Sequence, residues 1–343
     1  MRVGIINVTG YAGTELARLL YNHSGVKLVS VTGRGAVGDK LSTVFPHLHE
    51  FDLDIVSQLD SVDLAFSALP HAASAAALLP LIKQGIKVVD ISADFRLKNA
   101  QEYEGWYGVT HPAPELLPDS VYGLTELYRR QVARANIVAN PGCYPTSAIL
   151  ALAPALRAGI IHGDIIIDSK SGVSGAGRTL SLNTHYSEAN ENVSAYALSG
   201  HRHLPEIVQE LQAIAPDLPL AVTFVPHLIP MTRGMLSSCY AKLVEGKIAS
   251  GDKGREEVMQ IYKDFYKNEP FVKTVGVPPQ TKQTLGNNLC LLYPTVDVRT
   301  NRLMVISCLD NLVKGAAGQA IQNMNLMLGF PETMGLDAIA IFP

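Results

Sequence analysis

The length and composition indicate a folded chain of about two domains. The 343 residues are 47% hydrophobic and 17% charged, which is enough apolar sequence for sizeable cores, and a domain usually takes roughly 100–200 residues. The formal net charge of −3 excludes the basic surface that nucleic acids or anionic membranes attract. No apolar run reaches the ~18 residues of a membrane span, and the start MRVGIINVTG runs directly into strand-like sequence. We therefore expect a cytoplasmic protein with no nucleic-acid and no membrane partner.

In the N-terminal half, short apolar runs alternate with helix-like stretches. The runs are RVGIINV, KLVSV, VDLAFSAL, KVVDIS and NIVANPG, and helices are expected between them, for example at residues 14–22 and 72–84. Strands separated by helices of this length predict βαβ units and a parallel sheet, whose buried strands are almost continuously hydrophobic. The N-terminal half is therefore expected to be an α/β domain.

A glycine turn follows the first strand. Gly10 and Gly13 stand where a helix begins near Tyr11, and glycines at such a turn let the backbone approach the pyrophosphate of a dinucleotide. Asn7 occupies the place of the first glycine of the usual motif, but asparagine tolerates a positive φ better than most residues. The turn suits a dinucleotide, although an ordinary strand–turn–helix has the same pattern.

The second strand ends in a hydroxyl, a glycine and a guanidinium, at Thr32–Gly33–Arg34. An acidic residue at this place would bind the 2′-hydroxyl of the ribose in NAD. Thr32 and Arg34 suit a 2′-phosphate instead, through charge-assisted hydrogen bonds, and this favours NADP. The alternative for Arg34 is an exposed arginine in a loop.

One of the four cysteines lies in a different context from the rest. Cys239, Cys290 and Cys308 are within apolar strand-like sequence, where a thiol usually packs in a core, and no CxxC spacing predicts zinc or a disulfide framework. Cys143 lies in NPGCYPT, at a turn that opens a helix predicted over residues 147–158. Because a thiol at a helix N-terminus ionises more readily, Cys143 is the candidate nucleophile.

After Pro145 the pattern changes to longer strands separated by loops. These strands are expected at residues 164–169, 220–225, 235–243, 289–298 and 303–309, and a closing helix is expected at residues 312–328. Successive strands joined by loops predict a mixed or largely antiparallel sheet in a second domain.

The segment HRHLPE offers Cys143 a proton partner. His203 and Glu206 are three residues apart and share a face if a helix begins there, so the carboxylate could orient the imidazole. His201 is the alternative base. Two histidines and a glutamate also occur in zinc sites, but no further ligands lie nearby and no metal is predicted. A purely structural histidine is the third possibility.

Nine segments spread over nearly the whole chain form a set. They are GYAG (10–13), FSALPH (66–71), DISADFR (90–96), VYGLTE (121–126), NPGCYPT (140–146), SGVSGAG (171–177), HRHLPE (201–206), PMTRG (230–234) and DNLVKGAAGQA (310–320). In this order they resemble the N-acetyl-γ-glutamyl-phosphate reductase family of arginine biosynthesis, within the aspartate-semialdehyde dehydrogenase superfamily. Asn7 departs from the family, which normally has glycine there.

The resemblance implies a fold and a reaction. The fold is α/β, with a Rossmann-type NADP-binding domain over residues 1–142 and 311–343 and a mixed α/β catalytic and dimerisation domain over residues 143–310. The reaction is the NADPH-dependent reduction of N-acetyl-glutamyl 5-phosphate to the 5-semialdehyde and phosphate. It would pass through a thioester on Cys143, with His203 as general acid and base. The family also implies a homo-oligomer, either a dimer or a tetramer.

The residue patterns and the resemblance together define the other candidate site residues. The candidate cofactor-binding residues are Thr9, Gly10, Tyr11, Ala12, Gly13, Thr32, Arg34, Pro70, His71, Ser92, Gly175 and Asn311. The candidate substrate-binding residues are Asn140, Arg178, His201, Arg202, Glu206 and Arg233. Each of the three arginines could equally be a solvated side chain.

Three other functions remain open at this point. A reductase of a carrier-bound aminoadipyl phosphate in lysine biosynthesis is similar in sequence, but such proteins tend to depart from the CYPT and SGVSGAG forms kept here. Aspartate-semialdehyde dehydrogenase uses the same chemistry on an unacetylated substrate, and the contexts HRHLPE and NPGCYPT disfavour it. A non-catalytic NADP-binding regulator would be expected to lack the thiol or the base, and the chain has both.

Overall fold

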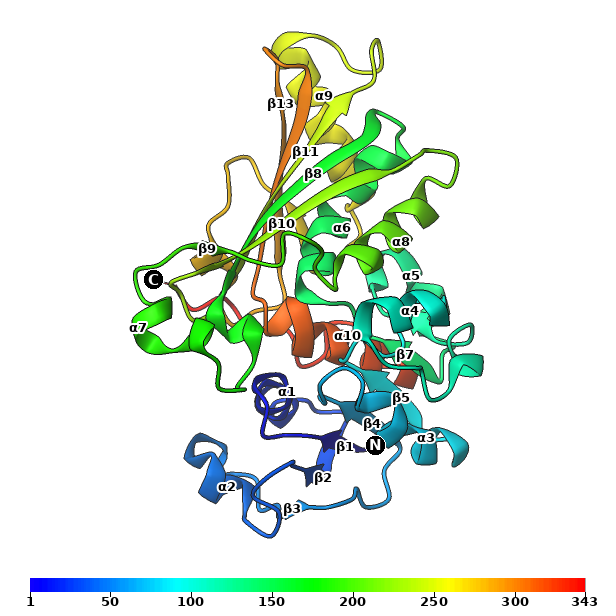
Figure 1. Cartoon of the computed structure of the whole chain (residues 1–343), viewed down its shortest axis with the longest axis vertical. Coiled ribbons are helices and arrows are strands. Elements are labelled where there is room, and N and C mark those ends of the chain that lie inside the picture. The colour runs from blue at the N-terminus through cyan, green and yellow to red at the C-terminus, as the bar shows by residue number, and fades with distance from the viewer. Residues whose placement is uncertain (343) are drawn as a thin grey trace. The chain divides into compact units, whose positions relative to one another are not determined.

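The computed structural model describes residues 1–342, which divide into two compact units. Unit 1 consists of Met1–Gly142 and Ala316–Ala338, and unit 2 consists of Cys143–Gly315 together with residues 339–342. Within the described residues, each unit is built around one seven-stranded sheet (Figure 1).

Unit 1 is a parallel α/β sheet in the strand order β3-β2-β1-β4-β5-β7-β6. Its strands are β1 (Arg2–Ile6), β2 (Lys27–Thr32), β3 (Ile55–Val56), β4 (Leu64–Ser67), β5 (Lys87–Asp90), β6 (Val121–Tyr122) and β7 (Ile137–Ala139). Its helices are α1 (Tyr11–Tyr21), α2 (Leu41–Val44), α3 (Ser74–Lys83), α4 (Ala100–Tyr107), α5 (Thr125–Val132) and α10 (Gly318–Leu328). The central strand β4 is buried at every position, as its unbroken apolar sequence requires. The parallel sheet predicted for this half is confirmed.

Polar side chains attach α10 to the rest of unit 1. The amides of Gln319 and Asn325 are buried. Gln319 Nε2 donates to the carbonyl of Gly123 at 2.9 Å, and Asn325 Nδ2 donates to the carbonyl of Met334 at 2.9 Å. A buried amide is stable only when its hydrogen bonds are made, so these contacts specify where the helix lies.

Unit 2 is a mixed sheet in the order β12-β13-β14-β11-β8-β10-β9. Its strands are β8 (Ile161–Gly172), β9 (Ser194–Ala195), β10 (Ala221–Ile229), β11 (Met235–Leu243), β12 (Val272–Thr274), β13 (Cys290–Asp297) and β14 (Arg302–Leu309). Its helices are α6 (Cys143–Arg157), α7 (Tyr186–Ala189), α8 (Leu204–Ile214) and α9 (Gly251–Phe265). The pairs β8–β10 and β12–β13 are parallel, and the other neighbours are antiparallel. The predicted mixed sheet is confirmed.

Helices α6, α8 and α9 pack against the strands of unit 2 (Figure 1). Along β8, burial alternates with a period of two, so that Ile165 and Ile167 are buried whereas Ile166 between them is 37% exposed. The buried residues face the helices, and the opposite face of the sheet remains accessible in the single chain.

The predicted closing helix over residues 312–328 is interrupted. Val313–Ala317 form a π-helical turn, and the α-helix starts only at Gly318. The backbone N–H of Gly315 bonds the carbonyl of Asp310 at 2.9 Å, five residues earlier, which is the spacing of a π-helix. The boundary between the units falls after Gly315, within this turn, so residues 311–315, which were predicted to belong to the first domain, lie in unit 2. Residues 339–342 do so as well, since the Ile341 N–H bonds the carbonyl of Leu285, and residue 343 lies outside the described part.

Asp90, at the end of β5, is a fully buried carboxyl group. It accepts hydrogen bonds from Ser74 Oγ at 2.6 Å, from the backbone N–H of Ser92 at 3.0 Å and from Ser92 Oγ at 2.7 Å. Burial, followed by the charge of nearby Asp94, raises the pKa of Asp90 to about 6. Between pH 3.8 and about 6, Asp90 therefore keeps its proton in the folded state and loses it in the unfolded chain.

Asp90→Asn tests this proton. The pKa of Asp90 is higher in the folded state than its unfolded value of 3.8. The protonated carboxyl group therefore contributes fully to the stability of the folded state below pH 3.8, and this contribution is lost as the pH rises through about 6. We expect the free energy of unfolding of the unmodified protein, relative to Asp90→Asn, to fall by on the order of 3 kcal/mol over this range, as urea unfolding at a series of pH values would measure. Asp60→Asn, which changes an exposed carboxylate of the same unit, is the control. The same loss in Asp60→Asn would contradict the assignment.

Candidate active site

Cys143 is the first residue of α6 and is partly exposed. The other three cysteines, Cys239, Cys290 and Cys308, are completely buried, and none of the four forms a disulfide. Burial raises the pKa of Cys239 and of Cys308 to about 12. The core location predicted for three of the cysteines is therefore confirmed, and Cys143 is the accessible thiol. The helix it opens begins four residues earlier than predicted, at Cys143 in place of residue 147.

Two histidines lie beside the start of α6. The ring of Tyr144 contacts the edges of both imidazoles, with centroid distances of 5.7 Å to His201 and 5.9 Å to His203. The two imidazole centroids are 4.8 Å apart. The histidine pair therefore packs against Tyr144, the residue that directly follows Cys143.

One hydrogen bond sets the tautomer of His201. The backbone N–H of His203 donates to Nδ1 of His201 at 3.1 Å. Burial, together with the charge of Arg202, lowers the pKa of His201 to about 4. Near neutral pH His201 is therefore uncharged, with its proton on Nε2, and acts as a hydrogen-bond donor.

His203 is the N-cap residue of α8, and Glu206 lies in the first turn of that helix. Glu206 is buried, and a carboxylate near a helix N-terminus interacts favourably with the helix dipole. The helix expected at HRHLPE is thus present. The orienting role predicted for Glu206 remains a prediction.

Two tyrosine hydroxyls form a short chain in the same region. Tyr196 Oη donates to Tyr144 Oη at 3.2 Å, and Tyr144 Oη donates to the carbonyl of His227 at 3.1 Å. Burial raises the pKa of Tyr196 to about 12 and raises that of Tyr144 further still. Both hydroxyls therefore stay protonated. Sequence reasoning missed both tyrosines, since only the position of Tyr144 next to Cys143 could have pointed to one of them.

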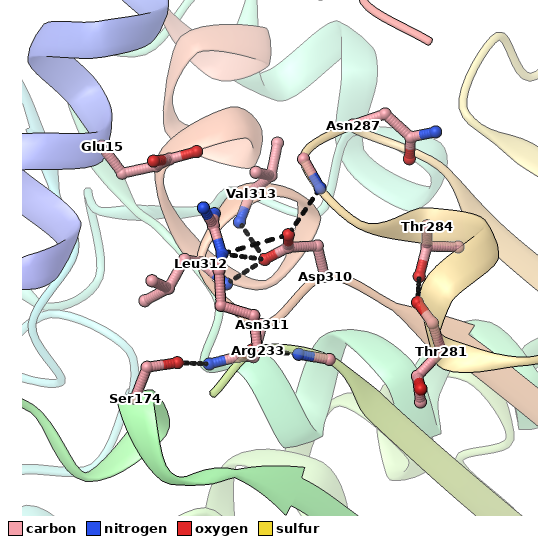
Figure 2. A network of polar contacts seen from close by, with 12 residues as sticks. Glu15, Ser174, Arg233, Thr281, Thr284, Asn287, Asp310, Asn311, Leu312 and Val313 are labelled. Atoms are coloured by element: carbon pink, nitrogen blue, oxygen red, sulfur yellow. Dashed lines mark hydrogen bonds and ion pairs between the residues drawn. The ribbon is translucent and has the colours of Figure 1, made fainter. Parts of the chain in front are cut away.

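The predicted substrate-binding arginines occupy different environments. Arg178 and Arg202 are exposed, whereas Arg233 is about one-fifth exposed, with a side-chain value of 21%. Arg233 Nε lies 3.2 Å from Oδ2 of Asp310, a carboxylate with no exposed surface (Figure 2). Asp310 was not predicted, because a buried acid has no sequence signal of its own.

Asn311 connects two loops of unit 2. Its Oδ1 accepts from the backbone N–H of Gly234 at 2.7 Å, and its Nδ2 donates to Ser174 Oγ at 2.9 Å (Figure 2). Asn311 is 2% exposed and its amide holds the two loops together; the predicted contact with the nicotinamide stays a prediction. Gly175, next to Ser174, is exposed.

Asn140 uses its side-chain amide to hold the chain that leads into α10. The side chain is fully buried in unit 1. Nδ2 donates to the carbonyl of Ala316 at 3.1 Å, and Oδ1 accepts from Asn323 Nδ2 at 3.0 Å. The substrate contact predicted for Asn140 stays a prediction.

The glycine turn of unit 1 has the geometry that the sequence predicts. Asn7 has a φ of 66°, the left-handed conformation that glycine adopts most readily. A Cβ on Gly13 would lie 2.4 Å from the carbonyl oxygen of Asn7, so only glycine fits there. Gly10 is the N-cap of α1 and makes no side-chain cap. The backbone N–H groups of Tyr11, Ala12 and Gly13 at this helix start are those a pyrophosphate would bind.

Thr9, after β1, and Thr32 and Arg34, at the end of β2, have separate roles. Thr32 is buried and its Oγ1 accepts from the backbone N–H of Asn7 at 3.2 Å, so it supports the turn. Thr9 Oγ1 also bonds within the turn, to Asn7 Oδ1 at 3.3 Å. Arg34 is exposed. Of the two residues predicted to bind a 2′-phosphate, only Arg34 is accessible to it.

The remaining candidates follow β4, which pairs with β1, and β5, which pairs with β4. Pro70 is exposed, and the ring of His71 lies 5.4 Å from that of Tyr107. Ser92 is buried and donates to Asp90. The carboxyl ends of adjacent parallel strands share one edge of the sheet, where dinucleotides bind in such folds. Pro70 and His71 are accessible at that edge. Ser92 is buried and holds the loop after β5 through its hydrogen bonds to Asp90.

Residues 1–342 contain neither a metal-binding cluster nor a membrane-spanning helix. No group of three or more histidine, cysteine, aspartate or glutamate side chains could hold a metal ion. No helix in the same range is long and apolar enough to cross a membrane.

Comparison with known proteins identifies both units. Residues 2–135 match the family described as "Semialdehyde dehydrogenase, NAD binding domain", and residues 143–311 match "Semialdehyde dehydrogenase, dimerisation domain". The N-acetyl-gamma-glutamyl-phosphate reductase of Dehalococcoides mccartyi is 55% identical over 343 residues, which cover 100% of this chain and 99% of that protein. The protein of the same name from Heliobacterium modesticaldum is 49% identical, with 100% of both chains covered.

The chain belongs to the N-acetyl-gamma-glutamyl-phosphate reductase family. The resemblance drawn from the nine segments is thereby confirmed. Solved structures agree on the fold: aspartate semialdehyde dehydrogenase II of Vibrio cholerae superimposes with a TM-score of 0.72 at 18% identity, over 96% of this chain and 98% of that one. The aspartate semialdehyde dehydrogenase of Candida albicans, solved with NADP, gives a TM-score of 0.70 at 12% identity, over 95% and 98%.

Selective alkylation tests the assignment of Cys143 as the accessible thiol. We expect iodoacetamide, at about pH 8, to modify Cys143 in the native protein and to leave the other three cysteines unmodified until the chain is unfolded, because a buried thiol is neither reachable nor ionised. Peptide mapping by mass spectrometry identifies the modified residue. Equal labelling of Cys239, Cys290 or Cys308 in the native protein would contradict the burial described above.

Proposed function

We propose that the chain reduces N-acetyl-γ-glutamyl phosphate to the 5-semialdehyde and phosphate with NADPH, a step of arginine biosynthesis. One observation carries the proposal: an accessible thiol opens a buried helix beside a histidine pair, in a chain 55% identical along its length to proteins named as this reductase. The proposed reaction joins a hydride donor, an acyl phosphate and a nucleophile that holds the acyl group between them.

The cofactor is NADP, and its reduced form, NADPH, would supply the hydride when bound. The start of α1, with Gly13 closing the turn against Asn7, offers backbone N–H groups to the pyrophosphate. Exposed Arg34 offers a guanidinium to the 2′-phosphate, which NAD lacks. Pro70 and His71 border the same edge of the parallel sheet.

Cys143 is the nucleophile. Its sulfur attacks the carbonyl carbon of the acyl phosphate, the bond from that carbon to the phosphate oxygen breaks, and phosphate leaves with the bonding electrons. The product is a thioester on Cys143. The N–H groups of the first turn of α6 would stabilise the developing oxyanion, as N–H groups at helix N-termini stabilise anions generally.

His203 is the acid and base. When the thioester carbon accepts the hydride, the carbonyl oxygen gains a negative charge, and His203 gives it a proton. It then takes that proton back as the carbon–sulfur bond breaks and the aldehyde leaves. His201 cannot share this work near neutral pH, because its Nδ1 is occupied and its pKa is near 4. Its Nε2–H is suited to hold a substrate oxygen.

Three arginines serve the anionic groups of the substrate. Arg178 and Arg202 lie at the surface of unit 2, and Arg233 is held by Asp310. A guanidinium binds a phosphate or a carboxylate through paired hydrogen bonds. The substrate carries both groups, so more than one arginine is needed.

The protein acts as a homo-oligomer. Unit 2 matches a dimerisation domain, and one face of its sheet, which includes Ile166, stays accessible in the single chain. We assign this face to the contact between two copies, in a dimer or in a tetramer built from dimers. The four unlinked cysteines fit the reducing cytoplasm, where we place the protein.

Cys143→Ser provides the main test. The reverse reaction, oxidation of N-acetyl-glutamate semialdehyde with NADP⁺ and phosphate, is measured by absorbance at the NADPH wavelength. We expect no turnover in Cys143→Ser and unchanged NADP binding by calorimetry, because the serine hydroxyl is too weak a nucleophile without activation. Cys308→Ser, at a buried thiol, should keep its activity. The aldehydes of aspartate and aminoadipate serve as competing substrates, and faster turnover of either would overturn the proposed specificity.

Replacement of the two histidines separates their roles. His203→Asn should lower kcat by roughly 10²–10⁴-fold, the usual worth of a general acid or base, with little change in the KM for NADP. It should also remove the dependence of kcat on pH that a titrating imidazole causes. His201→Asn should keep that pH dependence, since its own titration lies near pH 4. If the pH dependence disappears in His201→Asn and persists in His203→Asn, the assignments are reversed.

A further inference from the structure

The loop that carries Asp310 lies directly against the reactive cysteine. Gly315, on the π-helical turn Val313–Ala317, packs on the first residue of α6. A Cβ added to Gly315 would lie 2.8 Å from Cys143 Cβ, so close that one of the two must shift, and 3.3 Å from both Cys143 Cα and the carbonyl oxygen of Asp310. Gly315 does not have a positive φ. The position therefore needs glycine because of Cys143 and not because of its own backbone.

The carboxylate of Asp310 holds this turn in place. Its Oδ1 accepts from the backbone N–H of Leu312 at 2.8 Å and of Val313 at 3.2 Å (Figure 2). Its own carbonyl accepts the N–H of Gly315 at 2.9 Å. Asp310 thus bonds the backbone at the start of the turn and at Gly315, the residue that contacts Cys143.

The same carboxylate also binds two further segments of unit 2, at Gly286 and at Arg233. Its Oδ2 accepts from the backbone N–H of Gly286 at 2.8 Å and lies 3.2 Å from Arg233 Nε (Figure 2). Asp310 has no exposed surface. A buried carboxylate is tolerated only when its oxygens are paired and hydrogen-bonded, and its loss would leave buried donors without an acceptor. These contacts make the group rigid.

We propose that Asp310 and Gly315 are positioning residues of the reaction: the carboxylate of Asp310 fixes the 310–315 turn, and the bare face of Gly315 seats Cys143 in the orientation that attacks the acyl carbon. Neither residue touches the substrate. The inference rests on the proposed function, since it assigns to both residues the orientation of the proposed nucleophile.

Gly315→Ala is the test variant and Gly276→Ala is its matched control. Gly276 also lies in unit 2 without a positive φ, but a Cβ there meets nothing within 4 Å. We expect Gly315→Ala to lower kcat by roughly 10–100-fold, since displacement of a reacting group by about 1 Å costs on that order. The KM for NADP should stay the same. The rate of Cys143 alkylation by iodoacetamide between about pH 6 and 9 should change as well, because that rate reports the exposure and ionisation of this thiol alone. Gly276→Ala should match the unmodified protein in all three measurements.

Asp310→Asn tests the same turn from the other end. The asparagine side chain has an NH₂ group in place of one carboxylate oxygen, and this group cannot accept the hydrogen bonds that the oxygen accepted. We expect a loss of kcat, and we expect the double variant Asp310→Asn, Gly315→Ala to lose far less than the product of the two single losses, because both act through one contact. Asp297→Asn, which breaks the Asp297–Arg299 pair whose guanidinium is 85% exposed, is the control and should be active.

The outcomes separate the two proposals. Unchanged kcat and unchanged alkylation in Gly315→Ala overturn the positioning role, even if the unmodified protein is an active reductase. Global unfolding of Gly315→Ala, seen as a large fall in Tm, also overturns it, because it would show a role in the fold alone. Turnover in Cys143→Ser, or none in the unmodified protein, overturns the proposed function instead.

Discussion

The arrangement of unit 2 depends on the burial of one helix. Every residue of α6 from Tyr144 to Leu156 is buried, so the helix cannot slide or rotate without exposing apolar surface. Cys143 is partly exposed at the N-terminal end of this helix, and Arg157 is exposed at the other end. The position of the thiol is therefore set by the packing of the whole helix, and the catalytic group itself contributes little to it. A reactive group keeps its position best when it lies on an element that is fixed by its own packing.

Around this helix start, buried polar groups supply the orientation that apolar packing cannot. Apolar contacts are not directional, whereas a buried carboxylate or imidazole is stable only with its partners at defined angles. The His203 N–H selects the tautomer of His201. Asp310 gathers three backbone N–H groups and a guanidinium. In unit 1, Asp90 does the same for the loops that follow β4 and β5. Each of these groups converts a flexible loop into a rigid one at some expense in stability.

The two levels of similarity carry different information. The solved aspartate semialdehyde dehydrogenases share 12–18% of their residues with this chain and nearly all of its fold. The relatives at 49–55% identity share the name of a reaction as well. A fold of this kind accommodates several substrates, and the substrate is chosen by the side chains of the loops. Side chains within the shared motifs also have structural work: the amides of Asn140 and Asn311 each hold two segments of the chain together.

The sequence by itself determined the class of the fold, the parallel first sheet and mixed second sheet, the left-handed turn at Asn7, and the one thiol outside the cores. All of these follow from local patterns: apolar periodicity, glycine and asparagine at turns, and a cysteine at a helix start. Tertiary structure alone decided that Asp310 is buried against Arg233, that Tyr196 lies near Tyr144, that His201 is an uncharged donor, and that the closing helix begins with a π-helical turn. These features join residues far apart in the chain, and which buried donor meets which acceptor depends on how the loops pack, a property no local pattern contains.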